Sequence, residues 1–177
     1  AQALDAVLRA AELLQQQAPN LTFVFLGGGV EVRRLQQLAA DQSLSNVTFL
    51  PPVSMTEVGN YLNAADVLLV HLKKDPLFTI TIPSKTQAYM AVGKPILMAV
   101  DGDAADLVRD SGCGQIAESE NPQAIADAAL SLMQASSDEL NAMAINSRRF
   151  YQEKLSLSVG AGRFGQIFKK LAGLKEV

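Results

Sequence analysis

Three consecutive glycines, Gly27-Gly28-Gly29, follow an apolar run that is typical of a buried strand. Glycine lets the backbone approach a ligand closely and direct its N–H groups at it. The same residues could equally form a strand-to-helix turn that needs positive φ. Because short glycine motifs occur often by chance, the triplet alone leaves both interpretations open.

The segment from Lys73 to Lys85 (KKDPLFTITIPSK) is a second candidate, because it is long for a connection between a strand and a helix. It ends where Pro83-Ser84 begins a helix, and free N–H groups and the helix dipole favour an anion at such a start. Ser84 can donate its hydroxyl and Lys85 supplies a positive charge, so a diphosphate is the natural occupant. The alternative is that Ser84 only caps the helix and Lys85 is solvated.

The proline turn Leu50 to Ser54 (LPPVS) is a third candidate. At a strand end, its stiff backbone around Pro52 and Val53 could face a planar base, or it could be only a rigid connection. Acidic residues after a later strand could contact ligand hydroxyls, and of these Asp103 is a weak candidate for sugar binding. We expect at least two of the three acids in this loop to be solvated (Asp101, Asp103 and Asp106).

His71 lies inside an apolar strand, where a histidine is more often a satisfied core residue than a catalytic group. Cys113, between two glycines, is expected to be a small buried side chain. One histidine and one cysteine exclude histidine clusters, internal disulfides and metal sites built on several cysteines. Neither a P-loop nor a Ser-His-Asp or Cys-His arrangement is present.

Uniformly apolar strands that alternate with helices predict a parallel sheet covered on both faces, hence an α/β, doubly wound, Rossmann-like domain. In such a sheet the candidate loops leave the carboxyl ends of strands, where ligands bind. The expected strands are Leu21–Leu26, Val47–Leu50, Val67–Leu72, Pro95–Val100 and Gly114–Glu118. The expected helices are Ala1–Gln17, Glu31–Gln42, Ser54–Ala65 with Ser54 and Glu57 as a capping box, Pro83–Ala91, Asp103–Asp110 and, from Asn121, mostly helix with a break near Ser136-Ser137.

Both ends of the chain carry further expectations. The chain opens directly on a helix, whereas doubly wound domains usually begin with a strand, so we expect the first strand to lie upstream of Ala1. A last amphipathic helix, Val159–Leu171, is expected to have an exposed apolar face that reaches toward a missing half of a larger protein (Phe164, Ile167, Phe168 and Leu171).

Length and composition indicate one domain over residues 1–177, with 49% hydrophobic residues and a net charge of −3. This charge gives no sign of a broad basic surface for nucleic acid. No stretch reaches the roughly 20 apolar residues of a membrane span, and a single cysteine, which can form no internal disulfide, fits a cytoplasmic location.

The run PSKTQAYMAVGKPIL, Pro83 to Leu97, resembles a signature of family 4 of the retaining glycosyltransferases, which often read P-S-K-x-x-E-Y-M-A-x-G-K-P there. The resemblance extends over nearly the whole chain. The supporting pieces follow the family's order and spacing: AQALDAVLRAA, FVFLGGG, NVTFLPPVS, YLNAADVLLVHL and GDAADLV.

This resemblance implies the carboxyl-terminal half of a GT-B enzyme, whose other half binds the acceptor. It implies a nucleoside diphosphate sugar as donor substrate, UDP-linked, and neither metal nor cofactor. The diphosphate would lie against Gly27 to Gly29 and against Ile82, Ser84 and Lys85. The base would lie near Pro52 and Val53. The variant motif is similar to bacterial transferases that build surface polysaccharides such as O-antigen, including those of N-acetyl-fucosamine, and peripheral membrane association of the full-length enzyme is expected.

One departure concerns the ribose contact. The family usually has a ribose-binding glutamate at the position of Ala88, and often a second glutamate near the position of Ile80. Gln87 could substitute, although it points about 100° around the helix. We expect this half of the enzyme to be inactive on its own. Two alternatives remain. One is a non-catalytic α/β module that retains the fold, and the other is a sugar-nucleotide epimerase, which would need catalytic acids and a histidine in which the sequence is poor.

Overall fold

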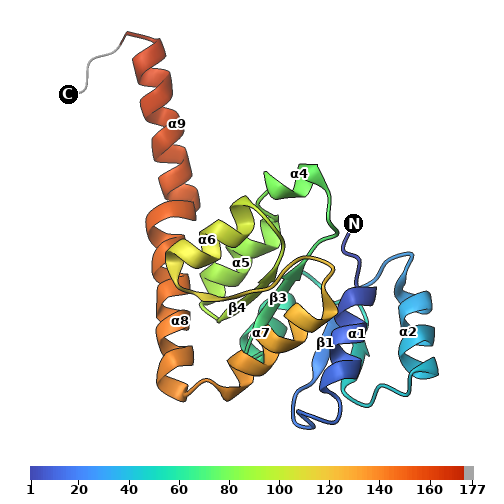
Figure 1. Ribbon diagram of the computed structural model, residues 1–177. Coiled ribbons are helices and arrows are strands. Elements are labelled where there is room, and N and C mark those ends of the chain that lie inside the picture. The colour runs from blue at the N-terminus through green and yellow to red at the C-terminus, as the bar shows by residue number, and fades with distance from the viewer. Residues whose placement is uncertain (174–177) are drawn as a thin grey trace.

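The computed structural model describes residues 1–173 as parallel strands alternating with helices (Figure 1). Residues 174–177 of the predicted domain lie outside the described range. The strands are β1 (Phe23–Leu26), β2 (Val47–Leu50), β3 (Leu68–His71), β4 (Ile96–Ala99) and β5 (Gly114–Ile116). The helices are α1 (Asp5–Leu14), α2 (Val32–Asp41), α3 (Val58–Ala64), α4 (Pro76–Thr79), α5 (Ser84–Val92), α6 (Asp103–Ser111), α7 (Pro122–Gln134), α8 (Ser137–Phe150), a π-helical turn (Tyr151–Leu155) and α9 (Leu157–Leu171).

The strands form two parallel sheets within residues 1–173. β1 pairs with β2, and the other sheet has the order β3-β4-β5. β4 is buried at all four positions because helices cover both of its faces, which is why its sequence is apolar throughout. The predicted α/β architecture with parallel strands is therefore confirmed, and it forms a partial Rossmann-like domain.

Helices cover the strands on two faces. On one face α1 and α7 pack over Phe23 of β1 and over Leu97 and Ala99 of β4. α2 packs beside α1 over Phe25 and Phe49. On the other face α5 and α6 pack over alternate residues of β3 and β4, such as Val70, Met98 and Ile96. One helical layer thus spans both sheets and joins them into a single body.

The direction of α1 shows how the two sheets are oriented. At the start of the helix, the carbonyl oxygen of Ala1 accepts from the N–H of Lys73, just beyond β3, at 3.0 Å. At the other end, Asn46 at the start of β2 donates its side-chain amide to the carbonyl of Ala11 at 2.8 Å. The carboxyl ends of the strands in both sheets therefore lie at the same edge, which we call the carboxyl edge.

Several predicted boundaries were wrong. α1 begins at Asp5 rather than Ala1, because the first residues form a turn with positive φ at Ala3 (43°). The predicted long connection Lys73–Lys85 contains the short helix α4, which Asp75 caps by accepting from the N–H of Leu77.

The predicted capping box was also wrong. α3 starts at Val58 because the Ser54 hydroxyl donates to the Glu57 carboxylate instead of accepting a backbone N–H. Only the reciprocal bond of the box forms, from the N–H of Ser54 to Glu57 at 3.2 Å. The break before α8 was predicted correctly, and there Ser136 and Glu139 form a complete capping box.

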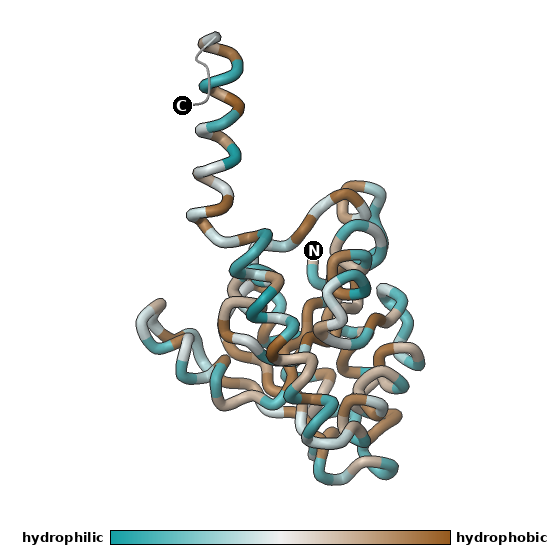
Figure 2. The backbone as a smooth tube through the Cα atoms, turned by 90° about the vertical axis from the view of Figure 1, so that its left-hand side faces the viewer, coloured by the Kyte–Doolittle hydropathy of each residue, from teal (hydrophilic) through white to brown (hydrophobic). Residues whose placement is uncertain are grey.

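The last helix, α9, projects from the body of the domain (Figure 1), and apolar and polar residues alternate along it (Figure 2). Its apolar side chains are exposed as predicted: Phe164 63%, Ile167 53%, Phe168 65% and Leu171 79%. Among the described residues, no helix combines the length and the apolar character that crossing a bilayer requires.

Candidate functional site

The glycine turn, Gly27 to Gly29, leaves β1 at the carboxyl edge and lies beside the proline turn after β2. The N–H of Gly27 donates to the carbonyl of Leu50 at 3.1 Å, and a Cβ placed on Gly28 would lie 3.0 Å from Pro52 Cγ. Gly27 and Gly29 have φ of 135° and 148°, and a Cβ at either position would meet no atom within 4 Å. The structure thus brings Pro52 against a turn whose backbone is open on one side.

The start of α5 leaves polar groups available at the same edge. Pro83 occupies the cap position and makes no side-chain cap, and the first backbone bond of the turn runs from the N–H of Thr86 to Pro83 at 2.9 Å. Ser84 is exposed, Ile82 is 39% exposed, and the first turn carries no acidic residue. These N–H groups and the helix dipole favour an anion here.

Lys85 is half-buried in the first turn of α5 and forms no ion pair within residues 1–173. Burial holds the pKa of Lys85 below the ordinary value of 10.5. α5 packs against β3, and the charge of Lys85 contributes slightly to lowering the pKa of His71 at the end of that strand. A partly desolvated cation without a carboxylate partner interacts strongly with a phosphate group.

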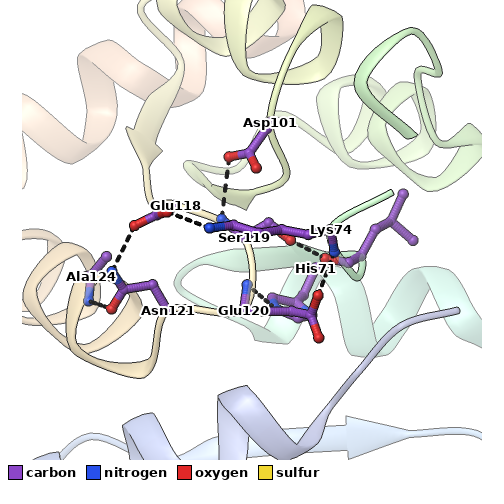
Figure 3. Close-up of polar contacts among 9 residues, drawn as sticks. His71, Lys74, Asp101, Glu118, Ser119, Glu120, Asn121 and Ala124 are labelled. Carbon is purple, nitrogen blue, oxygen red and sulfur yellow. Dashed lines mark hydrogen bonds and ion pairs between the residues drawn. The ribbon is translucent and has the colours of Figure 1, made fainter. Parts of the chain in front are cut away.

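The segment after β3 is fixed by the turn that follows β5 (Figure 3). Lys74 pairs with Glu118 through its side chain and donates its N–H to the Glu120 carboxylate. The Ser119 hydroxyl donates to the carbonyl of Leu72. This anchoring turn was not predicted from the sequence, although the polar run ESEN before Pro122 is typical of a turn at a helix start.

His71 is 2% exposed, and both ring nitrogens have partners, of which Figure 3 shows the contact with Glu120. Nδ1 contacts the carbonyl oxygen of Gln2, and Nε2 accepts from the N–H of Glu120 at 3.2 Å, which assigns the proton to Nδ1. Burial lowers the pKa of His71 below 6.5, against the raising effects of Gln2 and Glu120. This agrees with the predicted satisfied core histidine, and Cys113 is likewise fully buried.

The acidic residues after β4 have different roles. Asp101 accepts from the N–H of Ser119 at 3.3 Å, and Asp106 pairs with Arg109. Asp103 is exposed at the first position of α6, where a carboxylate stabilises the helix through its dipole. The structure therefore offers Asp103 a helix-stabilising role that needs no sugar.

The candidate residues come from both sheets and all lie toward the carboxyl edge. The Pro52 ring lies where a side chain at Gly28 would be, whereas no hydrogen bond within residues 1–173 joins Ser84 or Lys85 to the glycine turn. Val53 is half-buried, and Gln87 and Ala88 are exposed on α5. The glycine turn therefore presents an open backbone, and the start of α5 presents free N–H groups, at the same edge of the sheets.

Comparison with known proteins assigns the chain to a family. Residues 1–150 match the family described as Glycosyl transferases group 1. The chain belongs to this family. This group 1 glycosyltransferase chain is 27% identical over 127 residues to a probable glycosyltransferase, WbjE, of Pseudomonas aeruginosa, which covers 71% of the chain and 31% of that protein. It is 28% identical over 165 residues to a D-inositol 3-phosphate glycosyltransferase of a Nocardioides species, and this match covers 83% of the chain and 35% of that protein.

Solved structures share the fold of this group 1 glycosyltransferase chain. Sucrose-phosphate synthase from Thermosynechococcus elongatus superposes with a TM-score of 0.80 at 21% identity, over 97% of the chain and 43% of that protein. HepE of Anabaena, solved in complex with UDP and glucose, superposes with a TM-score of 0.76 at 19% identity, over 98% of the chain and 45% of that protein. The chain therefore spans about a third of the curated relatives and less than half of these structures.

Proposed function

We propose that this chain is the donor-binding part of a retaining glycosyltransferase and holds the diphosphate of a UDP-sugar at the start of α5. The observation that carries the proposal is a helix start with an exposed serine, a half-buried lysine that forms no ion pair within residues 1–173, and no acidic residue in its first turn. Ser84 and Lys85 would contact one phosphate. The open backbone of Gly27 to Gly29 would face the other.

In the proposed reaction, the bond between the anomeric carbon and the diphosphate oxygen breaks, the oxygen of an acceptor hydroxyl bonds to the same face of the sugar, and the hydroxyl proton passes to the departing diphosphate. Negative charge develops on the departing diphosphate. The dipole of α5 and the charge of Lys85 would stabilise that charge without a metal, because preorganised positive groups cost no reorganisation during reaction. The base of UDP would rest against Pro52 and Val53, and Gln87 and Asp103 would face the ribose and the sugar.

We further propose that the acceptor is bound by an amino-terminal half and that the product is a bacterial surface polysaccharide, with an N-acetyl-fucosamine-type donor. In support, the chain is similar to a structure described as WaaG, a glycosyltransferase involved in lipopolysaccharide biosynthesis, with a TM-score of 0.71 at 22% identity. The full-length enzyme would act in the cytoplasm, with peripheral contact to the membrane.

Thermal unfolding in the presence of UDP tests the proposal. At a UDP concentration of about 100 Kd, binding should stabilise the fold by about 2.7 kcal/mol. For a chain of this size that raises the unfolding midpoint by roughly 5–10 °C. Uridine, which lacks the diphosphate, should give a much smaller shift. A midpoint unchanged by millimolar UDP would instead support a non-catalytic module.

The matched pair Lys85→Met and Lys94→Met sharpens this test. Lys94 precedes β4 and so lies at the opposite edge of the sheet. Loss of a hydrogen bond to a charged phosphate costs about 1.5–3 kcal/mol, so Lys85→Met should weaken UDP binding roughly 10- to 150-fold. Lys94→Met should leave the affinity unchanged. If the two substitutions weakened UDP binding equally, Lys85 would contribute only through the overall charge of the chain and not through a contact with the diphosphate.

A further inference from the structure

Exposed apolar side chains occur together in the segment that joins β3 to α5 (Figure 1). Leu77 in α4 is 62% exposed, and Ile80, at the end of the same helix, is 71% exposed. The two residues are three apart in a helical turn, so their side chains lie on one face of α4. Ile82 is also exposed and lies two residues before Ser84. We call Leu77, Ile80 and Ile82 the α4 apolar surface.

The polar side chains of this segment form hydrogen bonds within it. The Thr79 hydroxyl donates to the carbonyl of Pro76 at 2.8 Å. The Thr81 hydroxyl donates to the carbonyl of Leu77 at 2.6 Å. Asp75 accepts from the N–H of Leu77 at 3.0 Å. A group that approaches α4 from outside therefore meets apolar side chains, because the hydroxyl donors of the segment already have partners.

The opposite side of α4 is fixed to the body of the domain. Phe78 packs against the core between β4, α5 and α6. The backbone of Thr79 lies where a side chain at Gly102 would be. Because these two contacts hold the inner side of α4, the face that carries Leu77 and Ile80 is turned outward at the carboxyl edge.

The α4 apolar surface lies close to the proposed diphosphate site. Ile82 and Ile80 are two and four residues from Ser84, so their Cα atoms lie at most about 7 and about 14 Å from that of Ser84. The base is proposed to lie at Pro52, beside the glycine turn, so the phosphate at the start of α5 is the one that carries the sugar. A sugar bonded to that phosphate is within reach of Ile80 and Ile82.

We infer that the α4 apolar surface contacts the donor sugar and that this sugar turns a methyl group toward Leu77 and Ile80. The inference rests on the proposed function and adds to it the residues that select the sugar. A methyl group placed there leaves water for an apolar surface, which is favourable. A hydroxyl group in the same place would lose water without gaining a partner. The donor class is therefore a sugar with a methyl substituent, carried at C6 or on an acetamido group.

Titration calorimetry with matched nucleotides tests the inference and distinguishes the two methyl groups. UDP-glucose has neither methyl group, UDP-6-deoxyglucose has the one at C6, and UDP-N-acetylglucosamine has the one on the acetamido group. At least one of the methyl-bearing nucleotides should bind the 177-residue chain about tenfold more tightly than UDP-glucose does. The preferred nucleotide identifies the methyl group. Equal binding of all three, or tightest binding of UDP-glucose, would overturn the inference.

Ile80→Thr and Ile145→Thr are the matched variants. Ile145 is 57% exposed on α8, which contacts the carboxyl-terminal end of α5 through the bond from Arg148 to Val92. Ile80→Thr removes apolar surface beside the sugar and should reduce the preference for the methyl-bearing nucleotide about fourfold. Ile145→Thr should retain the preference. A preference that survives Ile80→Thr, or that falls equally in both variants, would contradict the contact.

UDP, which has no sugar, is titrated against the wild type and both variants as the reference. Each preference is expressed relative to this reference, so that a change in diphosphate binding is not counted as a change in sugar recognition. A chain that binds UDP without distinguishing the three nucleotide sugars contradicts only this inference. A chain that binds neither UDP nor any of the nucleotide sugars contradicts the proposed function itself.

Discussion

Two glycine turns lie at the carboxyl edge, and glycine is needed in each for a different reason. The first is Gly27 to Gly29 after β1, and the second is Gly102 after β4. Gly27 and Gly102 have positive φ, 135° and 79°. A Cβ at Gly27 would meet no atom within 4 Å, whereas at Gly102 it would lie 2.6 Å from the backbone carbonyl carbon of Thr79 and closer still to the oxygen.

This difference separates a packing glycine from one that leaves room for a ligand. At Gly102 the backbone of α4 fills the space that a side chain would need, so the residue fixes the Lys73–Pro83 segment against α6. At Gly27 only the backbone conformation favours glycine, and the adjacent space is solvent. Glycine at the carboxyl edge therefore serves the fold on one side of the molecule and, in the proposed function, the diphosphate on the other.

The largest effect is expected from Gly102→Ala. The clash with Thr79 and the positive φ together should lower the free energy of unfolding by about 3 kcal/mol or more. For this chain length the thermal midpoint would fall by roughly 6–12 °C. Gly59→Ala is the control, since a Cβ there meets nothing within 4 Å and lies in α3. If both variants melt together, Gly102 has no special packing role.

His71, which lies between the two turns, should give the next largest effect. His71→Phe leaves the N–H of Glu120 and the carbonyl of Gln2 without their partner, at a cost of about 1–3 kcal/mol. The pKa of His71 is lowered in the folded state, so the unfolded chain binds its proton more readily. The stabilising contribution of His71 is complete above pH 6.5 and declines as the pH falls below that value.

Urea unfolding at about pH 8 and about pH 5.5 measures this contribution, because histidine titrates between those values. The difference in stability between the wild type and His71→Phe should be larger at the higher pH. A difference that is constant across this range would contradict the neutral, buried imidazole.

A smaller loss of stability is expected from Gly27→Ala, because only the backbone conformation is strained, at about 1–2 kcal/mol. Its effect on UDP should be relatively larger: a displaced N–H that no longer reaches the diphosphate would raise Kd about tenfold. Calorimetric titration with UDP and thermal unfolding measure the two effects separately. A variant that loses stability yet binds UDP as tightly as the wild type would give Gly27 the same purely structural role as Gly102.

The fold could be predicted because most strands are short and mainly apolar and most helices have an apolar face. Both are local patterns, and the strand VLLVHL and the helix start at Ser84 were found from them. Ser54 shows the limit of such patterns. The serine-glutamate spacing is that of a capping box, but the hydroxyl bonds to the Glu57 side chain and the helix starts later.

The anchoring of the candidate site could not be predicted in this way. Lys74 and its partner Glu118 are 44 residues apart in sequence, and no local pattern links them. The same holds for His71 and Glu120, which are 49 residues apart. The candidate residues themselves were named from local motifs and from a family resemblance. Their common place at the carboxyl edge follows from parallel topology, whereas the contacts that hold them depend on tertiary packing.

The smallest effect concerns Ala88, one turn beyond Ser84 on the same face of α5. Ala88→Glu restores the glutamate that the family resemblance associates with the ribose, at an exposed position where folding is little affected. One added hydrogen bond of about 1 kcal/mol should strengthen UDP binding roughly fivefold. Binding of a 2′,3′-dideoxy analogue should not improve, because the ribose hydroxyls are the partners of the new carboxylate.

Gln87→Glu is the matched variant, with the same added charge one position away and about 100° around the helix. If the ribose lies over the face shared by Ser84 and Ala88, only Ala88→Glu gains affinity. A gain confined to Gln87→Glu would move the ribose to the neighbouring face and make Gln87 its present partner. A loss of affinity in both variants would show that repulsion between the new carboxylate and the diphosphate dominates, and the proposed ribose position would be wrong.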